Sequence, residues 1–489
     1  MRKPTILALA VAPVAAVAAI GIMPGPTRLT GQSTGDAALA AAVREAVSDP
    51  EGHRGLAVAV VENGRVRTAG LGDRDPDGRP VEPGTPFEIG SITKVMTGML
   101  LARQAATGAV RPDEPVGAAL PELTGPAREV TLAELASHRS GLPRLPATSP
   151  GDLTRAWWTN LTGGNPYAGE DAGWLVEAAG DEEPGDRRGQ VRYSNLGVAL
   201  LGQALAARAG TSYPELLDRE LLRPLGMTAT VVATDAGALP AGRAEGATGS
   251  GRAVDPWVGS GYAPAGIGYW STVEDLARLV GATLAGTAPG ADAATPRFTD
   301  DERSRIGYGW FTTRHGDREV VWHNGATGGF HAYAGFERAT GRGVVVLGNT
   351  DADVAPIGLR LLGVPAEDAD RDIPPPVWIS AGLAVFFTFL GGLSLLTTAR
   401  RAPDRLTLAP AAAWAALYLG LGHRLGDWTV VPAWLWPVGV GLAAGGIALA
   451  AYRWRGLPSL AGAPPWRRLT GTVVSAVFAV LAGVVIAGG

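Results

Sequence analysis

Runs of apolar residues at two different spacings divide the first three quarters of the chain into helices and short strands. Helical spacing covers Ala37–Val47, Ser91–Gly108, Thr131–Ser137, Leu196–Arg208, Tyr213–Leu222 and Leu276–Leu284. Short strand-like runs cover Leu56–Val61, Arg65–Leu71, Glu319–His323, Phe330–Glu337 and Gly343–Gly348. The first two runs flank Asn63-Gly64, a pair typical of a β-hairpin. Strands at both ends with helices between them favour an α/β domain over residues 36–366, with one antiparallel sheet flanked by helices.

The pattern changes beyond this domain. A proline-rich linker is expected at residues 367–376, and four charge-free apolar runs follow it, Val377–Thr397, Leu406–Leu421, Val430–Tyr452 and Leu469–Gly489. Their lengths suit or nearly suit a bilayer core, the second being the shortest, so residues 377–489 are predicted to form about four transmembrane helices. The alternative is a buried helical core.

The positions of the charges predict an orientation for these spans. Arginines crowd the first connection, at 400–405, and the third, at 453–468, whereas the second connection holds only Arg424 and Asp427. Because positive loops stay on the cytoplasmic side, the preceding domain is expected outside the cell.

The first 35 residues predict export as well. Arg2 and Lys3 precede the uncharged run Pro4–Met23, which is typical of a cleaved signal peptide or an N-terminal membrane anchor, and both possibilities stay open. Thr27–Gly35 is interpreted as a polar linker. The prediction is a multi-pass protein of a bacterial plasma membrane, in contact with lipid, with its first domain on the extracytoplasmic side.

Composition excludes several other classes of chemistry. The chain has no cysteine, so disulfides and thiolate sites are ruled out, and its six histidines lack the spacing of metal ligands. No metal and no cofactor are therefore expected. The part of the chain before the apolar runs is net acidic, which argues against a nucleic-acid partner. The oligomeric state is not determined by the sequence.

Ser91 and Lys94 form the first candidate for catalysis. They stand one helical turn apart at the predicted start of a helix, so the amine can reach the hydroxyl beside free backbone N–H groups. The alternative is a helix cap next to an ordinary exposed lysine. Of the 42 basic residues only Lys3 and Lys94 are lysines, and an ammonium group can lose its proton where a guanidinium cannot. Lys94 is therefore a candidate base.

Two other segments carry polar groups that suit the same site. Tyr193 and Asn195 come just before the helix predicted at Leu196, and His323 precedes a glycine-rich stretch where a ligand can approach the backbone closely. Taken separately, each has a structural alternative: a buried tyrosine with Asn195 as the helix cap, and a hairpin loop with a structural histidine. The segment His138–Gly141 is interpreted as scaffold.

The order S-x-x-K, Y-x-N, H-x-G, with separations of about 100 and 130 residues, resembles the serine β-lactamase and penicillin-binding-protein superfamily. The likeness is strongest to its class C and D,D-carboxypeptidase/esterase branch and extends from Ala37 to Thr350. It also includes the segments Phe87–Lys94, Leu135–Pro143, Val191–Gly197, Arg223–Thr228 and His323–Phe330. The resemblance implies an antiparallel sheet domain with an all-helical subdomain and the active site between them.

The resemblance also implies the site residues. Catalytic roles fall to Ser91, Lys94 and Tyr193, and substrate contacts to Asn195, His323, Gly325 and Ala326. Ser91 would be acylated, and either Lys94 or Tyr193 would take the first proton. The backbone N–H groups of Ser91 and Ala326 would form the oxyanion hole. His323 stands where β-lactamases of this branch carry a lysine, and its weaker charge favours an esterase, amidase or carboxypeptidase over a β-lactamase.

The sequence thus predicts a membrane-anchored serine hydrolase that forms an acyl-enzyme on a small-molecule or peptide substrate, cell-wall peptide included. A penicillin-binding-like receptor that signals through the membrane spans is the alternative. A transporter is disfavoured because the spans hold no charged residue. The segments Arg144–Gly189 and Ala233–Gly268 are expected to line the pocket and have no recognisable signature, so ester, D-peptide and lactam substrates stay open.

Overall fold

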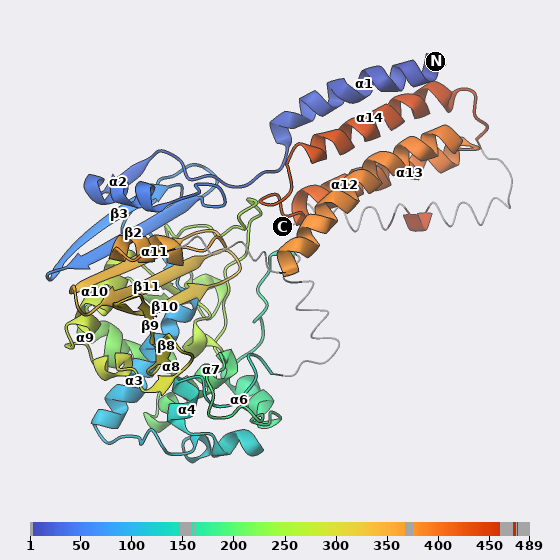
Figure 1. Cartoon of the computed structure of the whole chain (residues 1–489). Coiled ribbons are helices and arrows are strands. Elements are labelled where there is room, and N and C mark those ends of the chain that lie inside the picture. The colour runs from blue at the N-terminus through green and yellow to red at the C-terminus, as the bar shows by residue number, and fades with distance from the viewer. Residues whose placement is uncertain are drawn as a thin grey trace. The chain divides into compact units, whose positions relative to one another are not determined.

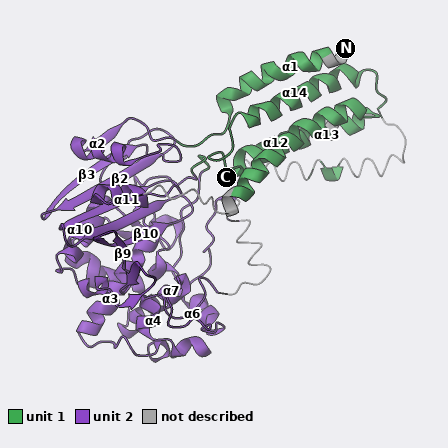
Figure 2. Ribbon diagram, viewed as in Figure 1, with its two compact units in different colours: residues 1–27, 249–252, 371–489 green, residues 28–248, 253–370 purple. Residues whose placement is uncertain are grey.

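The structure, a computed structural model, describes residues 3–146, 159, 162–366, 375–459, 473–475 and 477. It separates into two units, coloured differently in Figure 2. Unit 1 takes residues 1–27, 249–252 and 371–489, and unit 2 takes residues 28–248 and 253–370.

Unit 2 is organised around a nine-stranded antiparallel sheet (Figure 1), in the order β1-β3-β2-β12-β11-β10-β9-β8-β7. The strands are β1 Ser33–Gly35, β2 Gly55–Glu62, β3 Arg65–Gly72, β7 Phe298–Thr299, β8 Ser304–Ile306, β9 Phe311–His315, β10 Arg318–Ala326, β11 His331–Glu337 and β12 Arg342–Gly348. β2 pairs with β12, with Val58 opposite Val346 and Val60 opposite Val344. The sheet therefore joins strands from both ends of the unit, as the apolar pattern predicted.

The β2–β3 hairpin confirms the Asn63-Gly64 turn. Asn63 has φ 52° and Gly64 has φ 73°, the left-handed pair that a two-residue turn between twisted strands requires. The eight-residue strands on either side then pair in register from Gly55 opposite Gly72 to Glu62 opposite Arg65.

Alternate side chains of the central strands face two different helical layers. Val58, Val60 and Val344 pack with helices α2 (Ala37–Ala46) and α11 (Ala355–Leu362). Ala57, Ala59 and Val345 face the larger core, which includes α3 (Thr93–Ala106) and α10 (Val273–Leu284). Both faces of the sheet are covered, so its strands are almost entirely apolar.

The helical part of unit 2 lies between β4 (Phe87–Glu88) and β6 (Tyr269–Ser271) in the chain. Its helices are α4 Leu132–Ala136, α6 Ala172–Gly180, α7 Asn195–Arg208, α8 Tyr213–Leu217 and α9 Arg223–Leu225. The helix predicted over Tyr213–Leu222 is present but changes form, because Asp218–Leu222 is a π-helical segment between α8 and α9. α9 accommodates Pro224 in its first turn, where proline disrupts no backbone hydrogen bond.

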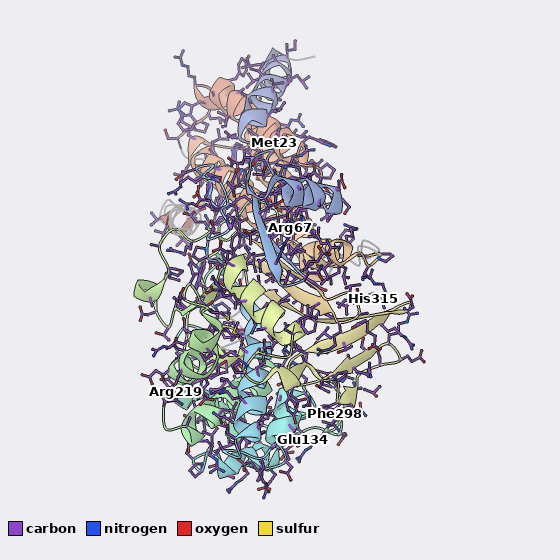
Figure 3. All side chains as sticks on the ribbon, turned by 90° about the vertical axis from the view of Figure 1, so that its left-hand side faces the viewer. Met23, Arg67, Glu134, Arg219, Phe298 and His315 are labelled. Carbon is purple, nitrogen blue, oxygen red and sulfur yellow. The ribbon has the colours of Figure 1, made fainter. Side chains whose placement is uncertain are left out.

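The short strands were not predicted from the sequence. A second sheet of three strands contains β4 (Phe87–Glu88), β6 (Tyr269–Ser271) and β5 (Val231–Val232). In the large sheet β7 to β9 were also missed; Phe298 of β7 and His315 of β9 are labelled in Figure 3. Segments of two to five residues are too short to establish a period of two, so pairing with neighbouring strands decides their conformation.

Unit 1 consists of long apolar helices. They are α1 Lys3–Ala19, α12 Pro375–Arg401, α13 Arg405–Leu425 and α14 Leu435–Trp454. Among the described residues, two segments are long and apolar enough to cross a membrane: Trp378–Arg401, with a mean hydropathy of 2.0, and Leu435–Trp454, with 1.5.

The expectation of about four spans is therefore reduced to two. The second predicted span, Leu406–Leu421, lies in α13, a helix that contains Pro410 and ends in charged or polar side chains. It is long enough but not apolar enough to count as a span. The fourth, Leu469–Gly489, lies outside the described residues apart from 473–475 and 477.

The close contact of α3 with Tyr308 generates a stability prediction. A Cβ on Gly98 would lie 2.2 Å from the backbone oxygen of Tyr308, so Gly98→Ala forces the two segments apart. We expect the variant to lower the free energy of unfolding by about 1–3 kcal/mol, despite alanine's better helix propensity. Chemical denaturation of the purified chain, followed by tryptophan fluorescence, measures this change.

Gly84→Ala is the matched control, because a Cβ there meets nothing within 4 Å. Its unfolding midpoint should stay near that of the wild type. Equal midpoints for the Gly98 and Gly84 variants would contradict the close packing of α3.

Candidate active site

Ser91 lies in a tight turn at the entrance to α3. The turn is a 3₁₀ turn over Gly90–Ile92, and α3 begins at Thr93, two residues later than predicted. Gly90 has φ +49°, and a Cβ on it would lie 3.0 Å from the backbone nitrogen of Ala326. Glycine thus allows the end of β10 to approach the backbone beside the serine.

Lys94 is buried directly beneath Ser91. Its Nζ lies 2.7 Å from Ser91 Oγ and donates a hydrogen bond to the backbone oxygen of Ala265 at 2.6 Å. The side chain is 1% exposed, so the alternative of an ordinary exposed lysine is wrong. Burial lowers the pKa of Lys94 well below its usual value, and the charge of Arg144 acts in the same direction. The amine is therefore suited to accept a proton at neutral pH.

Tyr193 approaches Ser91 from the other side. Its hydroxyl donates a hydrogen bond to Ser91 Oγ at 2.6 Å, and its ring centroid lies 5.0 Å from Lys94 Nζ. Burial raises the pKa of Tyr193 to about 12, against smaller opposing effects of the Ser91 hydrogen bond and Arg144. The phenol therefore stays protonated at neutral pH. Ser91 Oγ has a proton acceptor and a proton donor within hydrogen-bonding distance.

Ser194, rather than Asn195, caps α7. The Ser194 hydroxyl accepts a hydrogen bond from the N–H of Gly197 and donates one to the backbone oxygen of Pro143. The side chain of Asn195 is left to line the cavity beside Ser91, and its Oδ1 has no hydrogen-bond partner within the described residues.

The segment around His138 supports Tyr193, in agreement with its interpretation as scaffold. His138 Nδ1 accepts a hydrogen bond from the N–H of Ser194 at 3.2 Å, and its ring lies 4.5 Å from that of Tyr193. Burial lowers the pKa of His138 well below its usual value, so the ring is neutral. Arg139 is turned away, over the ring of Phe298 at 3.9 Å.

His323 is placed differently from the other predicted residues. It lies inside β10 rather than at a strand end, is fully buried, and is not one of the residues that line the cavity. Its Nδ1 lies 2.5 Å from the backbone oxygen of Asn324. Burial lowers the pKa of His323 to about 3, so it carries no charge at neutral pH.

Gly325 and Ala326 bring the end of β10 against the serine turn. A Cβ on Gly325 would lie 2.0 Å from the backbone oxygen of Ile89 and 3.1 Å from the backbone nitrogen of Ser91. Only glycine permits this approach. Ala326 follows, exposed at the cavity wall.

The cavity above Ser91 has a volume of about 350 Å³. Its lining residues are Gly90, Ser91, Arg144, Leu145, Pro146, Pro166, Tyr167, Glu170, Trp174, Asn195, Trp257, Tyr262, Ala265, Gly266, Ile267, Ala326 and Thr327. Most come from the two segments that had no recognisable signature. The ring centroids of Tyr167 and Trp257 are 5.4 Å apart, and those of Tyr167 and Tyr262 are 5.2 Å apart, so one wall is aromatic.

The segment Ala233–Gly268 was expected to line the pocket, but its contact with Lys94 was not predicted. Gly266 has φ +115°, and a Cβ there would lie 2.1 Å from the backbone oxygen of Gly90, so no side chain fits. Nothing in the sequence distinguishes this glycine from the other 68 of the 69 present. In the described part of the chain, no group of three or more histidine or acidic side chains could hold a metal ion.

This fold and site match one family. Residues 39–361 match the Beta-lactamase family, so the chain belongs to it. A class C β-lactamase from Rhodobacter sphaeroides has the same fold, with a TM-score of 0.56 and 24% identity; the alignment covers 67% of this chain and 98% of that one. The family and its structural neighbours are serine hydrolases.

Two curated relatives come from Escherichia coli strain K12. The D-alanyl-D-alanine-carboxypeptidase/endopeptidase AmpH is 31% identical over 191 residues, which are 37% of this chain and 45% of that protein. A β-lactamase is 30% identical over 238 residues, 47% of this chain and 56% of that protein. The chain spans about half the length of these relatives.

The burial of His323 predicts sensitivity to acid. In the unfolded chain an imidazole takes up a proton near its ordinary pKa, whereas in the fold the pKa of His323 is about 3. The unfolded state therefore binds more protons below about pH 6.5, and stability falls as the pH falls. Between about pH 7.5 and 5, His323 should account for about 2 kcal/mol of lost stability.

The measurement compares His323→Asn with the wild type by chemical denaturation at both pH values. The variant should lose about 2 kcal/mol less between them. His315→Asn, at a more exposed position on β9, is the comparison: partial burial and the charge of Arg303 lower the pKa of His315 by less, so this variant should reduce the acid loss less than His323→Asn does. An unchanged pH dependence in His323→Asn would contradict a neutral, buried imidazole.

Proposed function

We propose that this protein is a membrane-anchored serine hydrolase that works outside the cytoplasmic membrane through an acyl-enzyme at Ser91. The observation that carries the proposal is the position of Ser91 Oγ, 2.7 Å from Lys94 Nζ and 2.6 Å from the Tyr193 hydroxyl. A serine needs an adjacent base to become a nucleophile, and a buried amine with a lowered pKa supplies one.

Proton transfer follows from this arrangement. Lys94 takes the proton of Ser91 as Oγ attacks the carbonyl carbon, and the C=O bond opens to a tetrahedral oxyanion. The backbone N–H groups of Ser91 and Ala326 stabilise that charge. When the tetrahedral intermediate collapses, Tyr193 gives its proton to the leaving group and recovers one from Lys94. Water then attacks the acyl-enzyme, and transfers of the same kind release the acid and restore Ser91.

Asn195 and the end of β10 hold the substrate in this proposal. Asn195 Oδ1, which has no hydrogen-bond partner among the described residues, would accept a hydrogen bond from a substrate amide. Gly325 allows the backbone of β10 to lie beside Ser91, where a bound chain can run along it. His323 is a neutral, buried residue of β10 and stabilises that strand.

The substrates that fit best are esters and D-amino-acid peptides, with β-lactams less favoured. The names of the two relatives from Escherichia coli describe hydrolases of such compounds. One is a D-alanyl-D-alanine carboxypeptidase and the other is a β-lactamase. Because His323 is neutral, β10 has no cation at the position where β-lactamases of this branch carry a lysine, and lactam recognition there is weaker. A cell-wall peptide is the natural candidate for an enzyme on this side of the membrane.

Membrane attachment forms the second half of the proposal. Residues 36–366 would be the catalytic domain, 367–376 the linker and 377–489 a membrane domain with spans in α12 and α14. On α12 and α14 large apolar side chains are exposed, with Trp378 at 60%, Phe386 at 58% and Ile447 at 54%. Side chains of this kind need lipid or protein around them, which argues against the buried core of a soluble domain.

The alternative, a receptor that is acylated but does not turn over, would use the same Ser91. The enzyme is favoured because Lys94 and Tyr193 both contact the nucleophile, as deacylation requires. Product release measured over time separates the two, since a receptor releases one equivalent of product and then stops.

Labelling with a fluorophosphonate probe tests the nucleophile and its base together. Wild-type protein should be labelled and Ser91→Ala should not. Lys94→Arg should react about 10²–10⁴ times more slowly, because a guanidinium keeps its proton. Ser33→Ala, at an exposed serine of β1, should react like the wild type. Equal labelling of wild type and Ser91→Ala would rule out the proposed acyl-enzyme.

A further inference from the structure

We propose that Arg144 binds a carboxylate group of the substrate, so that the enzyme prefers acidic substrates over neutral ones of the same size. This inference rests on the proposed function and names the residue that selects the substrate. Three observations support it: the position of Arg144, the lack of a counter-ion among the described residues, and the neutrality of the other basic groups near Ser91.

Arg144 is held at the edge of the catalytic group by its backbone. Its carbonyl oxygen accepts hydrogen bonds from the N–H groups of Asn195, at 3.1 Å, and Leu196, at 3.2 Å. The side chain is exposed at the cavity wall, with its guanidinium carbon 5.6 Å from the ring centroid of Tyr193. The charge therefore lies within reach of a substrate bound at Ser91.

No carboxylate of the described residues neutralises this guanidinium. Other arginines of unit 2 form ion pairs, most of them at the surface. Arg188, for example, lies 2.8 Å from Glu134. Arg144 makes neither an ion pair nor a side-chain hydrogen bond within the described part of the chain, and its guanidinium lies over the Tyr193 ring. A guanidinium without a partner at a cavity wall is suited to bidentate binding of a carboxylate.

The other basic groups near the nucleophile carry no charge to compete with it. Lys94, His138 and His323 are all buried, and burial lowers the pKa of each. A substrate carboxylate near Ser91 therefore finds its cation in Arg144.

Glu170 is the acidic residue among those that line the cavity. Burial raises the pKa of Tyr167 and Tyr262, and the charge of Glu170 acts in the same direction. The charge of Arg144 favours a lower pKa at Lys94, Tyr193 and Tyr167. Arg144 is therefore close enough to influence the two groups that contact Ser91.

The test uses two pairs of activated nitrophenyl esters and the full-length protein. One pair carries a carboxylate or its methyl ester on the acyl group, and the other carries the same two groups on the leaving group. For each pair the readout is the ratio of kcat/KM for the acidic ester to kcat/KM for the neutral one. Arg144→Gln removes the charge, and Arg144→Lys restores it with a different geometry.

We expect the wild type to prefer the acidic member of at least one pair. Arg144→Gln should lower that ratio on the order of ten- to a hundredfold, as for the loss of a charge-assisted hydrogen bond. Arg144→Lys should recover part of it. Arg67→Gln is the control: Arg67 lies exposed on β3 (Figure 3), and it does not line the cavity, so the ratio should stay unchanged.

Two outcomes overturn the inference. In the first, the wild type shows no preference for the acidic ester in either pair. In the second, Arg144→Gln lowers kcat/KM equally for the acidic and the neutral ester. Both leave the proposed function intact, because Ser91-dependent hydrolysis and probe labelling continue. Failure of the function itself looks different, since Ser91→Ala would then match the wild type with every ester and with the probe.

A separate observation concerns the N-terminal helix, which the sequence left as either a cleaved signal peptide or an anchor. We infer that α1 stays attached to the mature protein as a membrane helix packed on α14. The two helices lie side by side in Figure 1. A Cβ on Gly441 would lie 2.7 Å from the backbone oxygen of Ala12, and one on Gly445 would lie 3.2 Å from that of Ala8.

This contact has the form of packing between membrane helices. Small residues spaced four apart on both helices let the backbones approach closely, which is how such helices associate in lipid. The pairing of Ala8 with Gly445 and of Ala12 with Gly441 also makes the helices antiparallel. Antiparallel packing brings Lys3, at the start of α1, to the same end of the helix pair as Arg453 in the last turn of α14, as expected if both lie on one side of a membrane. A signal peptide needs no such match to a helix more than 400 residues away.

A disulfide provides the test, because the natural chain has no cysteine. The ideal Cβ of Gly445 lies 3.5 Å from the Cβ of Ala12, within the range of a disulfide. We expect the double variant Ala12→Cys, Gly445→Cys to form this bond in membranes. After proteolysis between the two helices, the fragments should stay joined until reduced.

Val14→Cys with Gly445→Cys is the control, since Val14 is 70% exposed on the other side of α1, and this pair should form little or no bond. A mature protein that begins after Ala19 in mass spectrometry would overturn the inference. Equal cross-linking of both pairs would overturn the packing.

Discussion

The burial of one amine governs the architecture of this site. Lys94 Nζ lies between Ser91 Oγ and the backbone oxygen of Ala265, and both contacts require segments far apart in the sequence to meet. The Ala265 carbonyl is in place because Gly266 has no side chain and packs on Gly90. The serine turn is in place because Gly325 lets β10 approach Ile89 and Ser91. Three glycines thus bring together the backbones that enclose the amine, and enclosure makes the amine a base.

Burial also removes charge from the surroundings of the nucleophile. Besides Lys94, the imidazoles of His138 and His323 are neutral because burial lowers their pKa values. The pKa of Glu88, three residues before Ser91, is raised by burial to about 8, and its carboxyl group accepts a hydrogen bond from the N–H of Trp257 at 2.9 Å. A weakly charged interior leaves the electrostatics of substrate binding to the rim of the cavity, where Arg144 and Glu170 lie.

The two units follow different physical rules for burying apolar surface. In unit 2, the sheet alternates its side chains between two helical layers, and valines and alanines of β2 and β12 fill both. In unit 1, small residues let α1 and α14 touch along their backbones, while large apolar side chains such as Phe386 point outward. The first arrangement suits water outside and the second suits lipid.

The sequence alone determined the features that depend on local patterns: the Asn63-Gly64 hairpin, the helices at Ala37 and Leu196, the mixed fold and the family motifs. Ser91, Lys94 and Tyr193 were found because their spacing, and the rarity of lysine, are visible in the chain. Tertiary structure decided what no local pattern encodes. It buried His323 inside β10, moved the cap of α7 to Ser194, paired the short strands β7 to β9 and placed Arg144 at the cavity wall. Burial, strand pairing and close approach depend on partners that are distant in sequence, and only the folded chain brings those partners together.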